Sequence, residues 1–236
     1  MHFSRLIGAL VFIASLSLTP PSVAADIKDA EAALAAGRYA EARPILKPLA
    51  DAGDRDAQTL LGGLEVAGLG GPQDLRAAFE LFTKAAEQGQ PFAQYNLGLM
   101  YTKGEGGTTD LGAAAAWYRK SASQGVVVAM TQLGNMLLDG QGVAKDVPEA
   151  RRWLEHAAKG GDPEAQNRLG ILLGGGQEVP ADLVQAYVWL LLAERSGFKA
   201  AQRNIEILRR WLSTEERTKA EQAAAAWQPA VEWSEK

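Results

Sequence analysis

The chain has 236 residues, a formal net charge of −4 at pH 7 and no cysteine. The lack of cysteine excludes disulfides, thiolate metal sites and thiol nucleophiles, and the mildly acidic balance argues against a nucleic-acid partner. The packing of side chains must therefore stabilise the fold.

The first predicted element is a cleaved signal peptide over residues 1–24. Arg5 precedes an apolar run from Leu6 to Leu18, and Ser22-Val23-Ala24 supplies the small residues for cleavage after Ala24 or Ala25. The run is shorter than the roughly 20 residues that cross a bilayer, so a membrane anchor is the less favoured alternative. We expect a bacterial protein that is periplasmic or secreted, with no integral membrane span after cleavage.

Residues 25–56 predict a short helix pair that caps the N-terminal end of the fold. Ala30 to Ala36 and Ala42 to Leu49 carry alanine and leucine at helical spacing, and Gly37 lies between the two segments.

After this cap, a short sequence pattern recurs every 36 residues. Its copies open with Ala-Gln or Ala-Met at Ala57, Ala93, Ala129, Ala165 and Ala201. The first four copies continue to Leu-Gly, whereas the fifth has Ile205-Glu206. A fixed period of this length is typical of a solenoid, and we place its array at residues 57–198.

Each period predicts a helix A, a loop and a helix B. In the second copy, Ala93 and Leu97 mark helix A, and Ala114 and Trp117 mark helix B, each at helical spacing. Glycines after helix A suit a left-handed C-terminal cap, and aspartates before helix B can cap its free amides. The glycines are Gly68, Gly104 and Gly140, and the aspartates are Asp74, Asp110, Asp146 and Asp182. Further glycines that end helix B are Gly53, Gly89, Gly125, Gly161 and Gly197.

Large apolar residues recur at two adjacent positions of helix B. The first row is Leu81, Trp117, Trp153 and Trp189, and the second row is Phe82, Tyr118, Leu154 and Leu190. We expect both rows to form the core between repeats, because aromatic stripes at helical spacing usually pack inward. The alternative is that the tryptophan row is an exposed ligand platform.

Residues 199–227 predict C-terminal capping helices, followed by a tail at residues 228–236. Ser213 can cap a helix that has Glu215 and Glu216 in its first turn and ends before Pro229. The whole pattern predicts an all-α protein, a right-handed α/α solenoid of about six stacked helix pairs, and we expect a monomer.

The copy from Ala93 to Gly125 resembles the SEL-one-like repeat (SLR) family, which is related to tetratricopeptide repeats. The resemblance rests on Leu97-Gly98, Tyr101, Gly104, Gly106, Asp110 and Trp117-Tyr118, and it extends over about residues 57–197. It implies a non-catalytic scaffold that binds a protein or peptide, as an adaptor or regulator of envelope signalling, secretion or cell-wall processes. Other copies replace the tyrosine after Leu-Gly by Glu65, Leu137 and Leu173, so we expect their surfaces to differ from the family average.

No constellation for catalysis, cofactors or metals is predicted. After signal cleavage His156 is the one histidine that remains, and we expect it at the protein surface or at the boundary of the core. The glycine-rich loops lack the Gly-Lys-Ser/Thr of phosphate-binding loops, and each has too few acids for calcium. Two alternatives stay open: a cell-wall-active, β-lactamase-like hydrolase, whose known relatives are cysteine-rich, and glycan or peptidoglycan binding through Trp227 and Trp233.

The partner-binding side chains are expected on the A helices, which face the inner groove of such a solenoid. Stepping from Leu-Gly at helical spacing gives a row of aromatic, amide and cationic groups, which suits a peptide ligand. The predicted groove residues are Phe92, Tyr95, Leu99, Val128, Thr131, Asn135, Glu164, Asn167, Ile171, Arg203 and Arg210.

Overall fold

The computed structural model describes residues 27–176 and 178–229, which form twelve α-helices and no strand. The predicted signal peptide and Trp233 lie outside these residues. The helices are α1 (Ile27–Ala35), α2 (Tyr39–Asp51), α3 (Arg55–Ala67), α4 (Leu75–Glu87), α5 (Pro91–Lys103), α6 (Leu111–Ser123), α7 (Val127–Asp139), α8 (Val147–Lys159), α9 (Pro163–Gly175), α10 (Leu183–Arg195), α11 (Ala201–Arg209) and α12 (Thr214–Ala226).

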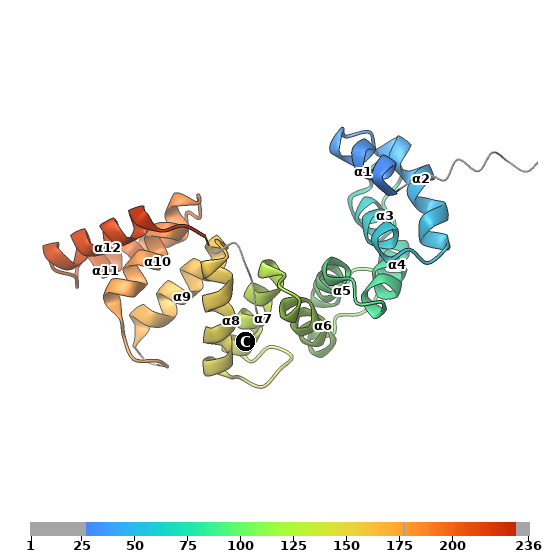
Figure 1. The fold of residues 1–236 in the computed structure, drawn as a ribbon. Helices are drawn as coiled ribbons and strands as arrows, with labels where there is room; N and C mark the ends of the chain where they lie inside the picture. Colours follow the sequence, from blue (N-terminus) through green and yellow to red (C-terminus); the bar gives the residue numbers. More distant parts are fainter. Residues whose placement is uncertain (1–26, 177, 230–236) are drawn as a thin grey trace, which may run out of the picture.

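The helices stack in chain order, which confirms the predicted all-α solenoid. Each helix from α1 to α10 packs on the helix that follows it. Figure 1 shows the pairs arranged along an arc, with α1 and α2 at one end and α11 and α12 at the other. Helices α3, α5, α7 and α9 are the A helices of the repeats, and α4, α6, α8 and α10 are the B helices.

The predicted helix caps are confirmed. Gly68, Gly104 and Gly140 end their A helices at φ values of 63°, 72° and 68°, in the left-handed region that glycine adopts at little cost. Each predicted aspartate caps a B helix by accepting a hydrogen bond from a first-turn backbone N–H. Such a cap stabilises a helix by roughly 1 kcal/mol.

The glycine of Leu-Gly allows helix A and helix B of one repeat to approach closely. A Cβ atom placed on these glycines would lie 2.7–2.8 Å from a side chain of the second B-helix row. The four pairs are Gly62 with Phe82, Gly98 with Tyr118, Gly134 with Leu154, and Gly170 with Leu190. All four of these partner side chains are buried, so they have little room to move.

The same contact explains why the last two helices depart from the predicted sixth pair. Both α11 and α12 pack mainly on α10, and the two helices do not form a pair like the others. In α11 the glycine position is Glu206, so a B helix cannot approach α11 as α10 approaches α9. Ser213 caps α12 as predicted, and Glu216 completes a capping box with it.

The prediction that both B-helix rows form the core is correct for one row. Phe82, Tyr118, Leu154 and Leu190 are buried, whereas Leu81, Trp117 and Trp153 are half-buried at the edge of the packing. The edge position leaves room for polar partners: the Lys120 ammonium lies 3.9 Å from the Trp117 ring centroid. Trp189 is the one tryptophan of the row that is buried.

The expectation that Glu65, Leu137 and Leu173 alter the surface is wrong, because all three side chains are buried. This helix A position faces the preceding repeat rather than solvent. Glu65 is held there by an ion pair in which Arg43 Nη2 lies 2.6 Å from Glu65 Oε1. The variation therefore changes how neighbouring repeats pack.

Buried glutamines near the start of the A helices tie successive elements together. The Nε2 groups of Gln58 and Gln94 donate to backbone carbonyls of the preceding helix, α2 and α4 respectively. Their Oε1 atoms accept hydrogen bonds from Gln88 and Gln124, at 2.9 and 2.7 Å. Each glutamine pair joins the first turn of helix A to the end of helix B in the same repeat.

This glutamine pair is incomplete in the fourth repeat. In the third repeat both partners have changed together, to Met130 and Gly160. In the fourth repeat Gln166 remains, but Ser196 occupies the partner position and is too short to reach it. Gln166 Oε1 is buried and has no hydrogen-bond partner among the described residues. A buried acceptor without a donor destabilises the fold.

We expect Ser196→Gln to stabilise the protein by about 1 kcal/mol, because the new amide can donate to Gln166 Oε1. The backbone suits the change: Ser196 has φ −80° and ψ 5°, and Gln88 has φ −80° and ψ 4°. Denaturant unfolding would measure the gain. Ser196→Met adds similar length without a donor, so an equal gain from methionine would contradict the hydrogen-bond explanation.

Candidate partner-binding groove

Apolar side chains follow the exposed face of the A helices from one repeat to the next. Phe92 on α5, Val128 on α7 and Ile171 on α9 are exposed. Ile207 on α11 is 47 % exposed and holds the position equivalent to Ile171, about two helical turns beyond that of Phe92 and Val128. It lies 36 residues after Ile171, so extending the period into the fifth copy identifies it from the sequence.

Two predicted groove residues, Thr131 and Asn167, are buried and do not offer a free surface. Thr131 Oγ1 donates to Asp162 Oδ1 at 3.0 Å, and Asn167 Oδ1 accepts from Asn204 at 3.2 Å. These bonds connect each A helix to the next A helix or its cap. Side chains at this position are therefore covered by the following repeat.

A polar cluster of predicted groove residues joins α7 to α9. Asn135 Nδ2 donates to Glu164 Oε1 at 2.8 Å, and Asn135 Oδ1 is buried without a partner among the described residues. Burial raises the pKa of the Tyr95 phenol, and the carboxylates of Glu164 and Asp162 raise it further. Tyr95 is therefore a neutral hydrogen-bond donor at pH 7.

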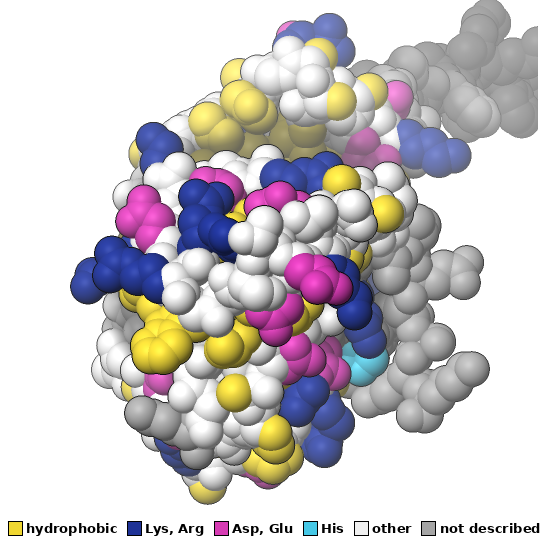
Figure 2. All heavy atoms as spheres, turned by 90° about the vertical axis from the view of Figure 1, so that its left-hand side faces the viewer, with side chains coloured by type: hydrophobic (Ala, Val, Ile, Leu, Met, Phe, Trp, Pro, Cys, Tyr) yellow, Lys and Arg dark blue, Asp and Glu magenta, His cyan; other side chains and the backbone are white. Residues whose placement is uncertain are grey.

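Exposed cationic and aromatic side chains lie on α11 and just after it. Arg203 and Arg210 are exposed, and neither forms an ion pair with any residue that the structure describes. Trp211, which sequence reasoning missed, follows α11 and is 74 % exposed. Figure 2 views this end of the arc and shows charges of both signs intermixed with apolar patches, rather than a continuous basic stripe.

An apolar notch lies in the groove between α9 and α11. It has a volume of about 170 Å³ and is lined by Ile171, Ile207, Leu208 and Leu190, with Asn204 at the polar part of its wall. Gly170, Gly174 and Gly175 line it without side chains, so the notch is open where other residues would fill it. Its size and lining suit an apolar side chain of a partner. Leu99, the remaining predicted groove residue, is half-buried on α5.

The described residues contain no group of three or more His, Cys, Asp or Glu side chains that could hold a metal. His156 is exposed on α8, as predicted. Within the same part of the chain, no helix has both the length and the apolar character needed to cross a membrane.

Comparisons with known proteins agree with this architecture. The Sel1 repeat model matches residues 55–90, 91–126, 127–162 and 163–198. A Sel1 repeat protein from Oxalobacter formigenes is 28% identical with a TM-score of 0.74, and the match covers 84% of this chain and 81% of that chain. A search of curated proteins found no match.

Two further solved structures resemble the chain. The protective antigen c5321 from uropathogenic Escherichia coli, which displays an SLR fold, is 28% identical with a TM-score of 0.56. The match covers 84% of this chain but 54% of c5321. The immunity protein Pa5087 from Pseudomonas aeruginosa is 19% identical with a TM-score of 0.51, over 87% of both chains, and shares the fold alone.

Sel1 repeat proteins are generally non-catalytic scaffolds for protein interaction, and the exposed apolar side chains on the A helices fit that use. The four matched units run without a gap from residue 55 to residue 198, which is more than half of the sequence. On this evidence the chain belongs to the Sel1 repeat family.

Proposed function

We propose that the groove binds a peptide segment of a partner protein. The observation that carries this proposal is a set of exposed apolar side chains on one face of successive helices. Phe92 and Val128 lie in the first turn of α5 and α7, and Ile171 and Ile207 lie about two turns further along α9 and α11. An apolar side chain of the peptide occupies the notch between α9 and α11. Binding energy is usually concentrated in a few such anchors.

The groups beside the notch indicate what else the peptide carries. Arg203 has no ion pair among the described residues, and a guanidinium forms strong paired hydrogen bonds with a carboxylate. Trp211 adds a large exposed apolar surface close in sequence. The preferred peptide therefore combines an apolar anchor with an acidic residue near it.

We further propose that the protein acts as an adaptor or regulator in the bacterial envelope. The support is the signal-peptide pattern of residues 1–24, which lies outside the described residues. Protein recovered from the periplasm should begin at Ala25 or Asp26. Retention of residues 1–24 in the recovered protein would contradict export by this route.

Selection from a displayed random-peptide library should yield peptides with an apolar residue and a nearby acid. We expect Ile171→Asp with Ile207→Asp to weaken a selected peptide about tenfold or more, because two carboxylates would enter the apolar notch. Fluorescence anisotropy of the labelled peptide measures this affinity.

Leu69→Asp is the matched control, because Leu69 is an exposed apolar residue outside the groove. It should leave peptide affinity unchanged. Circular dichroism of each variant checks that the helices remain intact. Equal affinity for wild type and the Ile171/Ile207 variant would place the peptide site elsewhere.

A further inference from the structure

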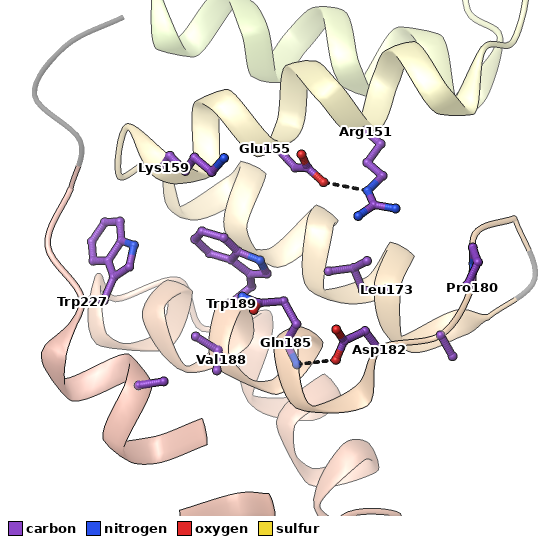
Figure 3. A pocket seen from close by; sticks show the side chains of 12 residues that line it. Arg151, Glu155, Lys159, Leu173, Pro180, Asp182, Gln185, Val188, Trp189 and Trp227 are labelled. Carbon is purple, nitrogen blue, oxygen red and sulfur yellow. Dashed lines mark hydrogen bonds and ion pairs between the residues drawn. The ribbon is translucent and has the colours of Figure 1, made fainter. Parts of the chain in front are cut away.

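A second cavity lies between the B helices α8 and α10 and the closing helix α12. It has a volume of about 760 Å³, and residues of all three helices line it, together with Trp227 just after α12. Figure 3 shows this pocket, with Trp189, Trp227 and Lys159 towards one side and Asp182 and Pro180 towards the other. Its lining is separate from the groove residues on the A helices.

The preceding junction between B helices has polar side-chain pairs that this one lacks. Between α6 and α8, Arg119 forms an ion pair with Glu149, and the indole Nε1–H of Trp153 donates to Glu149 at 3.1 Å. The polar groups of these three side chains are thus paired with one another. The equivalent residues one repeat later are Glu155, Gln185 and Trp189.

The substitutions leave polar groups available to a ligand. Glu155 cannot form an ion pair with Gln185, and it accepts instead from Arg151 on its own helix at 2.6 Å. No described residue accepts a hydrogen bond from the indole N–H of Trp189. Glu155, Gln185 and the indole thus supply both acceptors and donors to one pocket.

The aromatic part of the pocket is held in place by the fold. Trp189 is buried, and Trp227 packs against the same core cluster. A Cβ atom on Gly161 would lie 3.8 Å from Trp227 Cη2, so this indole lies against the turn after α8. Lys159 is exposed beside these indoles and has no ion pair with any described residue.

We infer that this pocket binds an acidic sugar. The apolar face of a pyranose ring can stack on an indole, and its hydroxyls can pair with Glu155, Gln185 and the Trp189 N–H. The sugar carboxylate pairs with the Lys159 ammonium. A flat aromatic acid would match the indoles and Lys159, but it offers no hydroxyl groups to Glu155, Gln185 and the Trp189 N–H.

The six tryptophan indole N–H groups allow a direct test by ¹H–¹⁵N NMR of the purified protein. Titration with glucuronate should shift the indole signals of Trp189 and Trp227 and leave that of Trp211 in place. Glucose, which has a neutral group where glucuronate has its carboxylate, should bind about tenfold more weakly. Single Trp→Phe variants assign the signals.

Two variants distinguish the roles of the lining residues. Lys159→Met should remove the preference for glucuronate over glucose, and Trp227→Ala should abolish the binding of both sugars. Trp211→Ala is the matched control and should bind like wild type. The proposal is overturned if neither sugar shifts Trp189 or Trp227, or if hydrocinnamate binds there and glucuronate does not.

Discussion

Gly142→Ala is expected to lower the free energy of unfolding by about 3 kcal/mol, because a steric cost adds to a backbone cost. Gly142 has a φ of 70°, which an L-residue with a Cβ adopts only at a cost. An added Cβ would lie 2.3 Å from the backbone carbonyl of Leu111, the first residue of α6. A backbone atom at a helix start cannot move aside as a flexible side chain could.

Gly89→Ala separates the two costs, because Gly89 has a φ of 82° and no atom lies within 4 Å of an added Cβ. It should lose only about 1 kcal/mol, the backbone part. Gly63 is helical and equally open, so Gly63→Ala should gain up to about 1 kcal/mol. Denaturant unfolding measures all three. Equal losses for Gly142→Ala and Gly89→Ala would show that the contact with Leu111 is unimportant.

Arg43→Met is expected to destabilise the protein by about 2 kcal/mol, because it leaves the buried Glu65 carboxylate without its cation. The side chains of Arg43 and Glu65 are 21% and 11% exposed, so water compensates the lost ion pair only in part. The ion pair joins α2 to α3 and so holds the N-terminal cap on the array. Thermal or denaturant unfolding would detect early loss of this cap.

The matched second variant is Arg43→Met with Glu65→Leu. Leucine already occupies the equivalent position at Leu137 and Leu173, where it is buried. The double variant should recover most of the stability that Arg43→Met loses, since no buried charge remains. If the double variant is as unstable as Arg43→Met, the ion pair does not explain the loss.

The repeat spacing was sufficient to predict the helices and their caps. The equivalents of Gly104 and Asp110 recur in the central units, because the helices of each unit have the same free backbone groups at their ends. Such local requirements can be recognised in a single sequence. The role of Gly98 was not predicted. Glycine is needed at position 98 because Tyr118 on the next helix lies so close to it. This close contact exists only in the packed pair of helices, so one helix alone does not indicate it.

The exposed face of the A helices was predicted in part, for a related reason. Helical spacing correctly places Phe92, Val128 and Ile171 on an exposed face. It cannot show that the following repeat covers Thr131 and Asn167, because that depends on Asp162 and Asn204 in another helix. Sequence spacing describes the face of one helix, whereas burial depends on its neighbour.

The pocket at α8, α10 and α12 could not be predicted from the period at all. Trp189 belongs to a repeating row, but Trp227 follows the last helix and has no equivalent in other repeats. The two come together because α12 packs on α10, where Arg195 donates to the backbone carbonyl of Ala224. In this protein the irregular C-terminal end of the repeat array thus forms a pocket that the regular repeats do not have.

Glu206 also determines how the array can change its copy number. Duplication of a whole unit, such as residues 127–162, would carry Gly134, Gly142 and the cap Asp146 with it, so the close approach of its two helices and its helix cap are reproduced and the arc lengthens by one step. A unit appended after α11 would meet a glutamate where helix B must approach. Tandem duplication can therefore extend this protein from within, while both ends stay unchanged.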